Sequence, residues 1–306
     1  MPRPVRVIWI LLAVQLALGM IAYVHFLVTG QYVVLNLYFS VLGTLFFLLM
    51  TATECSLAMI CRSWFDSDEP MRLAWGTIAC ASLARLIGAF LRAVSDGHLR
   101  WGDWLQLSQP LGGMFLSLSQ LGLVVGGPVS MAFLAFGLGR VLGIQRKFHL
   151  VGSLTRGDKA LVFLILAFSV SQLSINLPLL RSHPSMGTVL LWLSDPLLSV
   201  LLIEATLVRR SVIRMGQGLV ARCWGMFVLA IVITSAGDAT IWASSHNMLS
   251  ESMTALSWYI WFLASAAFAS APAYQLAAIS LASKESVPVA EKRYGKSNAH
   301  NSSSTM

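Results

Sequence analysis

The stretch "TATECSLAMICRSW" (residues 51–64) places a glutamate, Glu54, directly after a long run of apolar residues. A run of roughly 20 apolar residues crosses the ~30 Å hydrocarbon core of a bilayer as a helix. The run that ends at this stretch therefore predicts a transmembrane helix over 33–61, with an acidic residue inside it and close to one membrane surface.

The composition of the whole chain indicates the same class of protein. The chain has 306 residues, of which 57% are hydrophobic and 11% charged, and its mean hydropathy is +0.73, whereas about a quarter of the residues in a soluble domain are charged. The sequence predicts an all-α membrane protein with eight transmembrane helices. We expect the spans at 6–28, 33–61, 71–95, 111–142, 159–180, 186–208, 218–244 and 253–283.

The basic residues indicate the orientation of these spans. Seventeen of the 21 lysines and arginines lie in five segments that eight spans put on one side of the membrane: the N-terminus, the turn at 62–72, the loop at 140–159, the loop at 209–222 and the segment after Ser283. Because cytoplasmic loops are rich in Lys and Arg, both termini are predicted to be cytoplasmic, in a plasma or inner membrane. Anionic lipid headgroups account for the net charge of +8, so we expect no nucleic-acid partner.

An internal duplication is indicated by repeated spacings. Glu54 precedes Arg72 by eighteen residues and Glu204 precedes Arg222 by the same number, and a Trp-Gly pair follows each arginine. The stretch "GGPVSMAF" (126–133) also resembles "SAPAYQLA" (270–277). We predict a parallel repeat of four plus four helices about an axis along the membrane normal. Its units are residues 1–148 and 149–283, followed by a disordered cytoplasmic tail at 284–306.

The repeated glutamates flank predicted cytoplasmic turns. Glu54 lies about 12 Å along its helix from Arg62, at 1.5 Å per residue, and Glu204 lies about 7 Å from Arg209. The equal spacings predict that Glu54 contacts Arg72 and that Glu204 contacts Arg222. These pairs are interpreted either as structural clasps of two helical hairpins or as a proton or cation gate on the cytoplasmic side.

Three ionisable residues are predicted to lie deeper, namely Arg85, Asp195 and Asp238. Charges at this depth face the bundle interior and have partners or water. Arg85 and Asp195 are interpreted as a static bridge between the halves, or together with Asp238 as a polar substrate or proton pathway. Pro128 and Pro272 are predicted to kink the helices that contain them.

Motifs for metal, haem, nucleotide or nucleophilic chemistry are missing from the sequence. All lysines lie in the region of the loop at 140–159 or in the tail, so none offers a retinal attachment point within the membrane. We therefore predict no cofactor, no metal and no catalytic residues. The leading hypothesis is a small secondary transporter or channel-like permease with a polar site between the two repeats. The alternatives are a membrane-embedded sensory or scaffold subunit that acts through cytoplasmic partners, and an intramembrane enzyme.

The predicted topology is testable with reporter fusions. Reporters placed after Ser283 and in the loop at 148–156 should report the cytoplasm, while a reporter near His183 should report the opposite side, because the eight spans alternate in direction. Termini on opposite sides of the membrane would contradict both the even span number and the parallel repeat.

Overall fold

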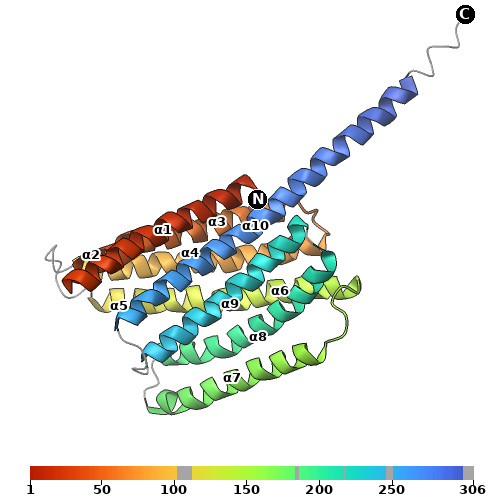
Figure 1. The fold of residues 1–306 in the computed structure, drawn as a ribbon. Coiled ribbons are helices and arrows are strands. Elements are labelled where there is room, and N and C mark those ends of the chain that lie inside the picture. Colours follow the sequence, from red (N-terminus) through yellow and green to blue (C-terminus); the bar gives the residue numbers. More distant parts are fainter. Residues whose placement is uncertain (102–111, 183–185, 217, 246–250, 299–306) are drawn as a thin grey trace, which may run out of the picture.

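The structure, a computed structural model, describes residues 1–101, 112–182, 186–216, 218–245 and 251–298, and all regular elements in these ranges are helices (Figure 1). The helices are α1 (Arg3–Thr29), α2 (Val33–Leu37), α3 (Thr44–Ser63), α4 (Pro70–Trp101), α5 (Gly112–Val124), α6 (Ser130–Lys147), α7 (Arg156–Ser182), α8 (Met186–Met215), α9 (Leu219–Ser245) and α10 (Glu251–Asn298). Two π-helical turns, η1 (Tyr38–Gly43) and η3 (Val125–Val129), join α2 to α3 and α5 to α6. The prediction of an all-α fold is confirmed.

Six helical segments of the described chain are long and apolar enough to cross a membrane: Arg3–Thr29, Val33–Ser63, Pro70–Ser95, Leu118–Lys147, Leu219–Thr240 and Trp258–Ser283. The predicted spans at 159–180 and 186–208 coincide with α7 and α8, which are not among these six, although α8 contains the shorter apolar stretch Pro196–Val208. The chain is thus a polytopic membrane protein with six candidate spans. The count of eight and the side on which the termini lie remain predictions.

Successive long helices run in opposite directions, so their connections gather at the two ends of the bundle (Figure 1). The N-terminus, the turn between α3 and α4, the loop between α6 and α7 and the point where α10 leaves the bundle lie together at one end. These are the segments in which the lysines and arginines cluster. We call this end of the molecule the basic end.

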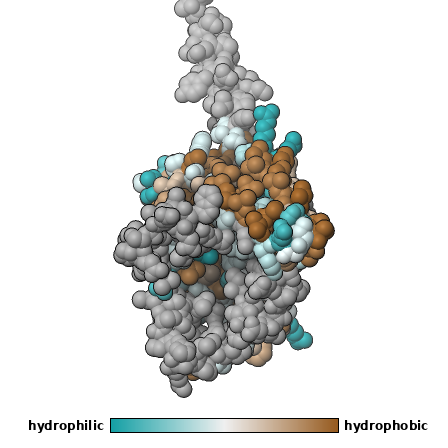
Figure 2. All heavy atoms as spheres, turned by 90° about the vertical axis from the view of Figure 1, so that its left-hand side faces the viewer, coloured by the Kyte–Doolittle hydropathy of each residue, from teal (hydrophilic) through white to brown (hydrophobic). Residues whose placement is uncertain are grey.

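The outer surface of the bundle is apolar. On α1, the side chains of Val7, Ile10, Val14 and Ile21 are each more than half exposed, and on α7 Phe163 is 70% exposed. In Figure 2 the described surface is mostly hydrophobic over the upper part of the bundle, where α1 lies. An exposed apolar surface of this extent on a helical bundle is expected to contact lipid and not water.

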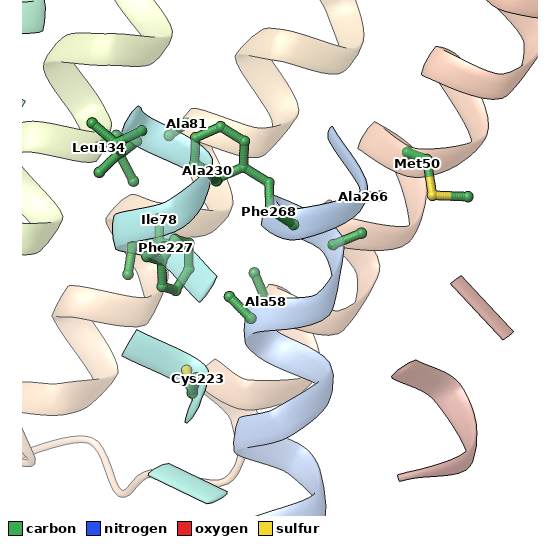
Figure 3. Close-up of a cluster of buried hydrophobic side chains, with 14 of the residues drawn as sticks. Met50, Ala58, Ile78, Ala81, Leu134, Cys223, Phe227, Ala230, Ala266 and Phe268 are labelled. Carbon is green, nitrogen blue, oxygen red and sulfur yellow. The ribbon is translucent and has the colours of Figure 1, made fainter. Parts of the chain in front are cut away.

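The interior is centred on α10, which packs against α1, α3 and α9. Between residues 264 and 273, α10 consists mostly of buried alanine and serine, which let neighbouring helices approach closely. Aromatic rings fill the space beside it: the ring centroids of Trp75 and Trp224 are 5.8 Å apart, and those of Trp224 and Phe227 are 5.6 Å apart. Figure 3 shows side chains from α3, α4, α6, α9 and α10 meeting in this core.

Pro128 and Pro272, the two prolines predicted to kink their helices, lie in different kinds of helix. Pro128 is buried inside the π-helical turn η3, where the ladder of α-helical hydrogen bonds is interrupted. A proline has no N–H group and its ring crowds the carbonyl four residues before it, so a wider turn accommodates it. Pro272, in contrast, lies within the continuous helix α10, and its carbonyl accepts a hydrogen bond from the Cys61 thiol at 3.5 Å.

The helix α10 continues past Ser283 to Asn298 and projects beyond the bundle (Figure 1). Residues 284–298 are thus helical, where the sequence predicted the start of a disordered tail, and residues 299–306 lie outside the described part of the chain. Helix nucleation is the unfavourable step and extension adds one hydrogen bond per residue. A helix formed inside the bundle can therefore extend through a segment whose composition alone predicts disorder.

Glycines set the distance between α4 and the α5–η3 segment. A Cβ atom built on Gly88 would lie 2.5 Å from the backbone of Gly126, and one on Gly122 would lie 2.8 Å from the carbonyl oxygen of Gly88. Only a residue without a side chain allows this backbone contact, which holds α4 in place beside the π-helical turn.

The variant Gly88→Ala should lower stability by about 2 kcal/mol, because the added methyl group forces the two backbones apart. The matched control is Gly127→Ala, whose Cβ would meet nothing within 4 Å. This control should be neutral or slightly stabilising, since alanine favours a helix more than glycine does. Thermal unfolding in detergent measures both variants, and equal melting temperatures would contradict the close packing at Gly88.

Candidate functional site

A buried ion pair joins α3 to α4 in the first half of the chain. The Arg85 guanidinium donates a hydrogen bond through Nη2 to Oε1 of Glu54. The Glu54 side chain is 1% exposed and that of Arg85 is 13% exposed. Charges inside a membrane helix bundle require such a partner, because unpaired burial of either charge is strongly unfavourable.

Two further groups complete the surroundings of this ion pair. Ser82, three positions before Arg85 on α4, is fully buried near the Glu54 carboxylate, and its hydroxyl donates to the carbonyl oxygen of Ile78 at 3.0 Å. The Phe268 ring of α10 lies under the guanidinium, with Cζ of Arg85 4.1 Å from the ring centroid. Figure 3 shows Phe268 reaching from α10 toward Ala81 and Ala230. The cluster of Glu54, Arg85, Ser82 and Phe268 therefore connects α3, α4 and α10.

The predicted contact between Glu54 and Arg72 is wrong. Arg72 instead donates from Nη1 to the carbonyl oxygen of Phe65 in the turn, at 3.2 Å. In a helix each Cα–Cβ bond tilts toward the N-terminus, so the Glu54 side chain leans away from the turn between α3 and α4. On the antiparallel α4, the side chains of Arg72 and Arg85 both lean toward that turn. The deeper arginine therefore meets the glutamate, and the equally spaced one does not.

The corresponding contact between Glu204 and Arg222 is also wrong. Glu204 lies on α8 and faces α6, where a Cβ built on Gly139 would be 3.0 Å from its Oε1 atom. Its Oε2 atom is buried and has no hydrogen-bond partner, while Arg222 is exposed at the start of α9. The directions of the side chains again explain the difference, because Glu204 leans away from the turn that Arg222 faces.

The two glutamates thus have different surroundings. Glu54 and Glu204 are 150 positions apart, and the residue 150 positions after Arg85 is Ser235. Ser235 is uncharged and donates its hydroxyl hydrogen to the carbonyl of Ile231 at 2.8 Å. If the predicted repeat relates the two halves, the position of Arg85 in the first half corresponds to Ser235 in the second.

The remaining predicted site residues are Asp195 and Asp238. The Asp195 side chain lies outside the part of the chain whose side chains the structure describes, so a bridge from Arg85 to Asp195 stays a prediction. Asp238 is half-buried on α9. Among the described residues, no group of three or more histidine, cysteine or acidic side chains is placed to hold a metal ion.

Sequence reasoning missed Phe268, Ser82 and Gly139 as parts of these sites. Of these three, only Ser82 could have been found from sequence spacing, because it precedes Arg85 by three positions and positions i and i+3 share a helix face. Phe268 and Gly139 belong to helices distant in sequence, and no local pattern connects them to Arg85 or Glu204.

No family model, no curated protein and no solved structure matches this chain. The site is therefore interpreted from its own chemistry.

The variant Arg85→Gln should lower stability by about 3 kcal/mol or more, because it leaves the Glu54 carboxylate buried without a cation. The matched control Arg72→Gln removes one hydrogen bond to a carbonyl and should lower stability by about 1 kcal/mol. The double variant Glu54→Gln with Arg85→Gln should recover part of the loss, since two neutral amides replace the ion pair. Thermal unfolding in one detergent compares all three variants, and a larger loss for Arg72→Gln than for Arg85→Gln would assign Arg72 as the partner of Glu54.

Proposed function

We propose that the protein is a small secondary transporter in which Glu204 takes up and releases a proton. The observation that carries this proposal is the buried Glu204 oxygen without a hydrogen-bond partner, within the apolar stretch Pro196–Val208 of α8. In apolar surroundings without a cation, the neutral acid is favoured over the carboxylate, so access to water and the position of nearby charges decide whether the group holds a proton.

Access to Glu204 from the basic end is supported by a cavity of about 360 Å³ whose lining includes Leu207. Leu207 follows Glu204 by three positions, so the two side chains are neighbours on the surface of α8. Three residues of an α-helix rise by about 4.5 Å, so Leu207 is the cavity-lining residue nearest to Glu204 along α8.

The contacts of three helices in each half support the predicted repeat of four plus four helices, whereas α1 packs against α10 and α7 packs against α8. With α3, α4 and α6 equivalent to α8, α9 and α10, the contact of α3 with α4 matches that of α8 with α9, and the contact of α4 with α6 matches that of α9 with α10. The contact of α3 with α10 likewise matches that of α8 with α6. The adjacent Trp75 and Trp224 rings then lie near the repeat axis.

Within such a repeat, the Glu54–Arg85 pair serves as the fixed site and Glu204 as the titrating site. Two halves that rock against each other expose a central site alternately to each side of the membrane. The aromatic rings around Trp75 and Trp224 fill the centre, which corresponds to a closed state between these two openings. The basic end is placed at the cytoplasm of a plasma or inner membrane, next to anionic headgroups.

A sensory or scaffold subunit is the second candidate, and the position of α10 favours it. This helix lies in the centre of the bundle, contacts Arg85 through Phe268 and continues beyond the bundle to Asn298. A change at the Glu54–Arg85 pair could therefore shift α10 and reach a partner at the basic end. An intramembrane enzyme has less support, because the Glu54 carboxylate forms an ion pair with Arg85 and is not free to act as an acid or base.

Proton binding by Glu204 is testable without a known solute. In proteoliposomes on a solid-supported membrane, a jump from neutral to acidic pH should produce a transient charge displacement as the proton enters the site. The variant Glu204→Gln should lose most of this signal, because an amide cannot bind the proton. The matched control Glu69→Gln, at an exposed position in the turn before α4, should keep it.

An unchanged signal in Glu204→Gln would contradict the transporter proposal. In that case, a conformational change of α10 that depends on the Glu54–Arg85 pair, measured with a spin label at Ser283, would support the sensory candidate.

A further inference from the structure

The cavity at the basic end lies between the end of α6, the loop that follows it and α8. Its lining consists of Arg146, His149, Val151, Gly152, Leu154 and Leu207, and its volume is about 360 Å³. Beside it, the buried Ser211 hydroxyl of α8 donates to Oε1 of Gln145 on α6 at 2.8 Å, which ties the two helices together. Volumes of this order hold small organic ligands.

The rim of the cavity is formed by a capped helix end. The backbone N–H groups of His149 and Leu150 donate to the carbonyls of Arg146 and Gln145, both at 3.0 Å, in the pattern that ends a helix with a left-handed residue. His149 occupies this left-handed position with φ 56°, where glycine is the usual residue. These bonds engage the last carbonyls of α6, whose partial negative charge would otherwise repel an anion.

Arg214 of α8 supports the same loop. Its Nη1 atom donates to the carbonyl oxygen of His149 at 3.3 Å. Gly152, with φ +60°, lies so close that an added Cβ would be 2.3 Å from Nη2 of Arg214. A glycine is required there, and the loop wraps closely around the guanidinium. The loop therefore lies against one cation, Arg214, and the cavity is lined by a second, Arg146.

Basic residues outnumber acidic ones in the segment that contains the end of α6 and the loop after it. The stretch 140–160 contains one acidic residue, Asp158, against five basic residues. Asp158 accepts from Arg210 at 2.8 Å and from the Thr155 backbone N–H at 2.9 Å, where it caps α7. Arg146 forms no ion pair with any acid that the structure describes. An anionic ligand would supply the missing negative charge.

We propose that this cavity binds a phosphate monoester carried on a small organic group. A guanidinium binds phosphate oxygens in pairs, and both Arg146 and His149 line the cavity. Val151, Leu154 and Leu207 line the apolar part of the cavity and fit the organic group. The phosphate belongs either to a soluble phosphomonoester or to an anionic lipid headgroup, since basic cavities at this level of a membrane protein also meet headgroups. The site does not depend on proton transport by Glu204.

Binding is tested with purified full-length protein in a phosphate-free buffer by thermal unfolding in two arms. The first arm adds glycerol 3-phosphate to protein in a neutral detergent. The second compares nanodiscs of phosphatidylcholine with nanodiscs that also contain phosphatidic acid. We expect a rise of the melting temperature in at least one arm. A rise in the first arm alone identifies a soluble ligand, a rise in the second alone identifies a lipid headgroup, and a rise in both identifies a site for the phosphate group itself.

Variants assign the effect to the cavity. Arg146→Gln should abolish the rise, and so should Leu207→Trp, which fills the cavity without changing its charge. The matched control Lys147→Gln removes the same charge from the adjacent exposed residue and should keep the rise. The absence of a rise in both arms, or an equal rise in wild type and Arg146→Gln, would overturn the proposal. Neither result depends on the charge displacement assigned to Glu204, so the two proposals fail separately.

Discussion

The bundle depends on the neutralisation of one carboxylate, Glu54, by one guanidinium, Arg85, inside apolar surroundings. Either charge alone would be strongly unfavourable there, so the two helices that carry them are held at one relative height and rotation. The Phe268 ring under Arg85 extends this constraint to α10. One ion pair and one cation–π contact therefore fix the positions of α3, α4 and α10 relative to one another, although α10 is far from α3 and α4 in the sequence.

The other contacts between helices in the interior are close and mostly apolar. The small residues of α10 and the glycines of α4 and η3 allow backbones to approach, and aromatic side chains fill the spaces that remain. Because lipid offers no hydrophobic driving force for helix association, such packing supplies much of the stability of a membrane bundle. Aromatic rings pack closely at Trp75 and Trp224, and a cavity lies at the basic end, beside α6 and α8.

The different surroundings of Glu54 and Glu204 are the basis of the proposed function. A repeat that kept an arginine opposite both glutamates would hold both carboxylates in fixed ion pairs. In the predicted repeat, Ser235 stands at the position that corresponds to Arg85, and Glu204 faces Gly139 of α6. We propose on this basis that Glu54 has a structural role and that Glu204 binds and releases a proton.

The amino-acid sequence by itself determined the helical class, the membrane environment and the gathering of basic residues at one end. These properties follow from local composition and from the constant rise per residue of a helix, so they need no knowledge of neighbours. The sequence also showed that Glu54 and Glu204 lie inside apolar helices. The number of spans beyond six and the cellular side of each end are still predictions.

The partners of those glutamates were decided only by the tertiary structure. Equal sequence spacing suggested Arg72 and Arg222, but the tilt of side chains toward each helix N-terminus moves Glu54 away from Arg72 and toward Arg85. Contacts with Phe268 and Gly139 depend on the rotation of whole helices about their axes, which no local pattern encodes. The cavity at the basic end likewise depends on the tertiary structure. Its walls come from α6, the following loop and α8, which meet only after the bundle has formed.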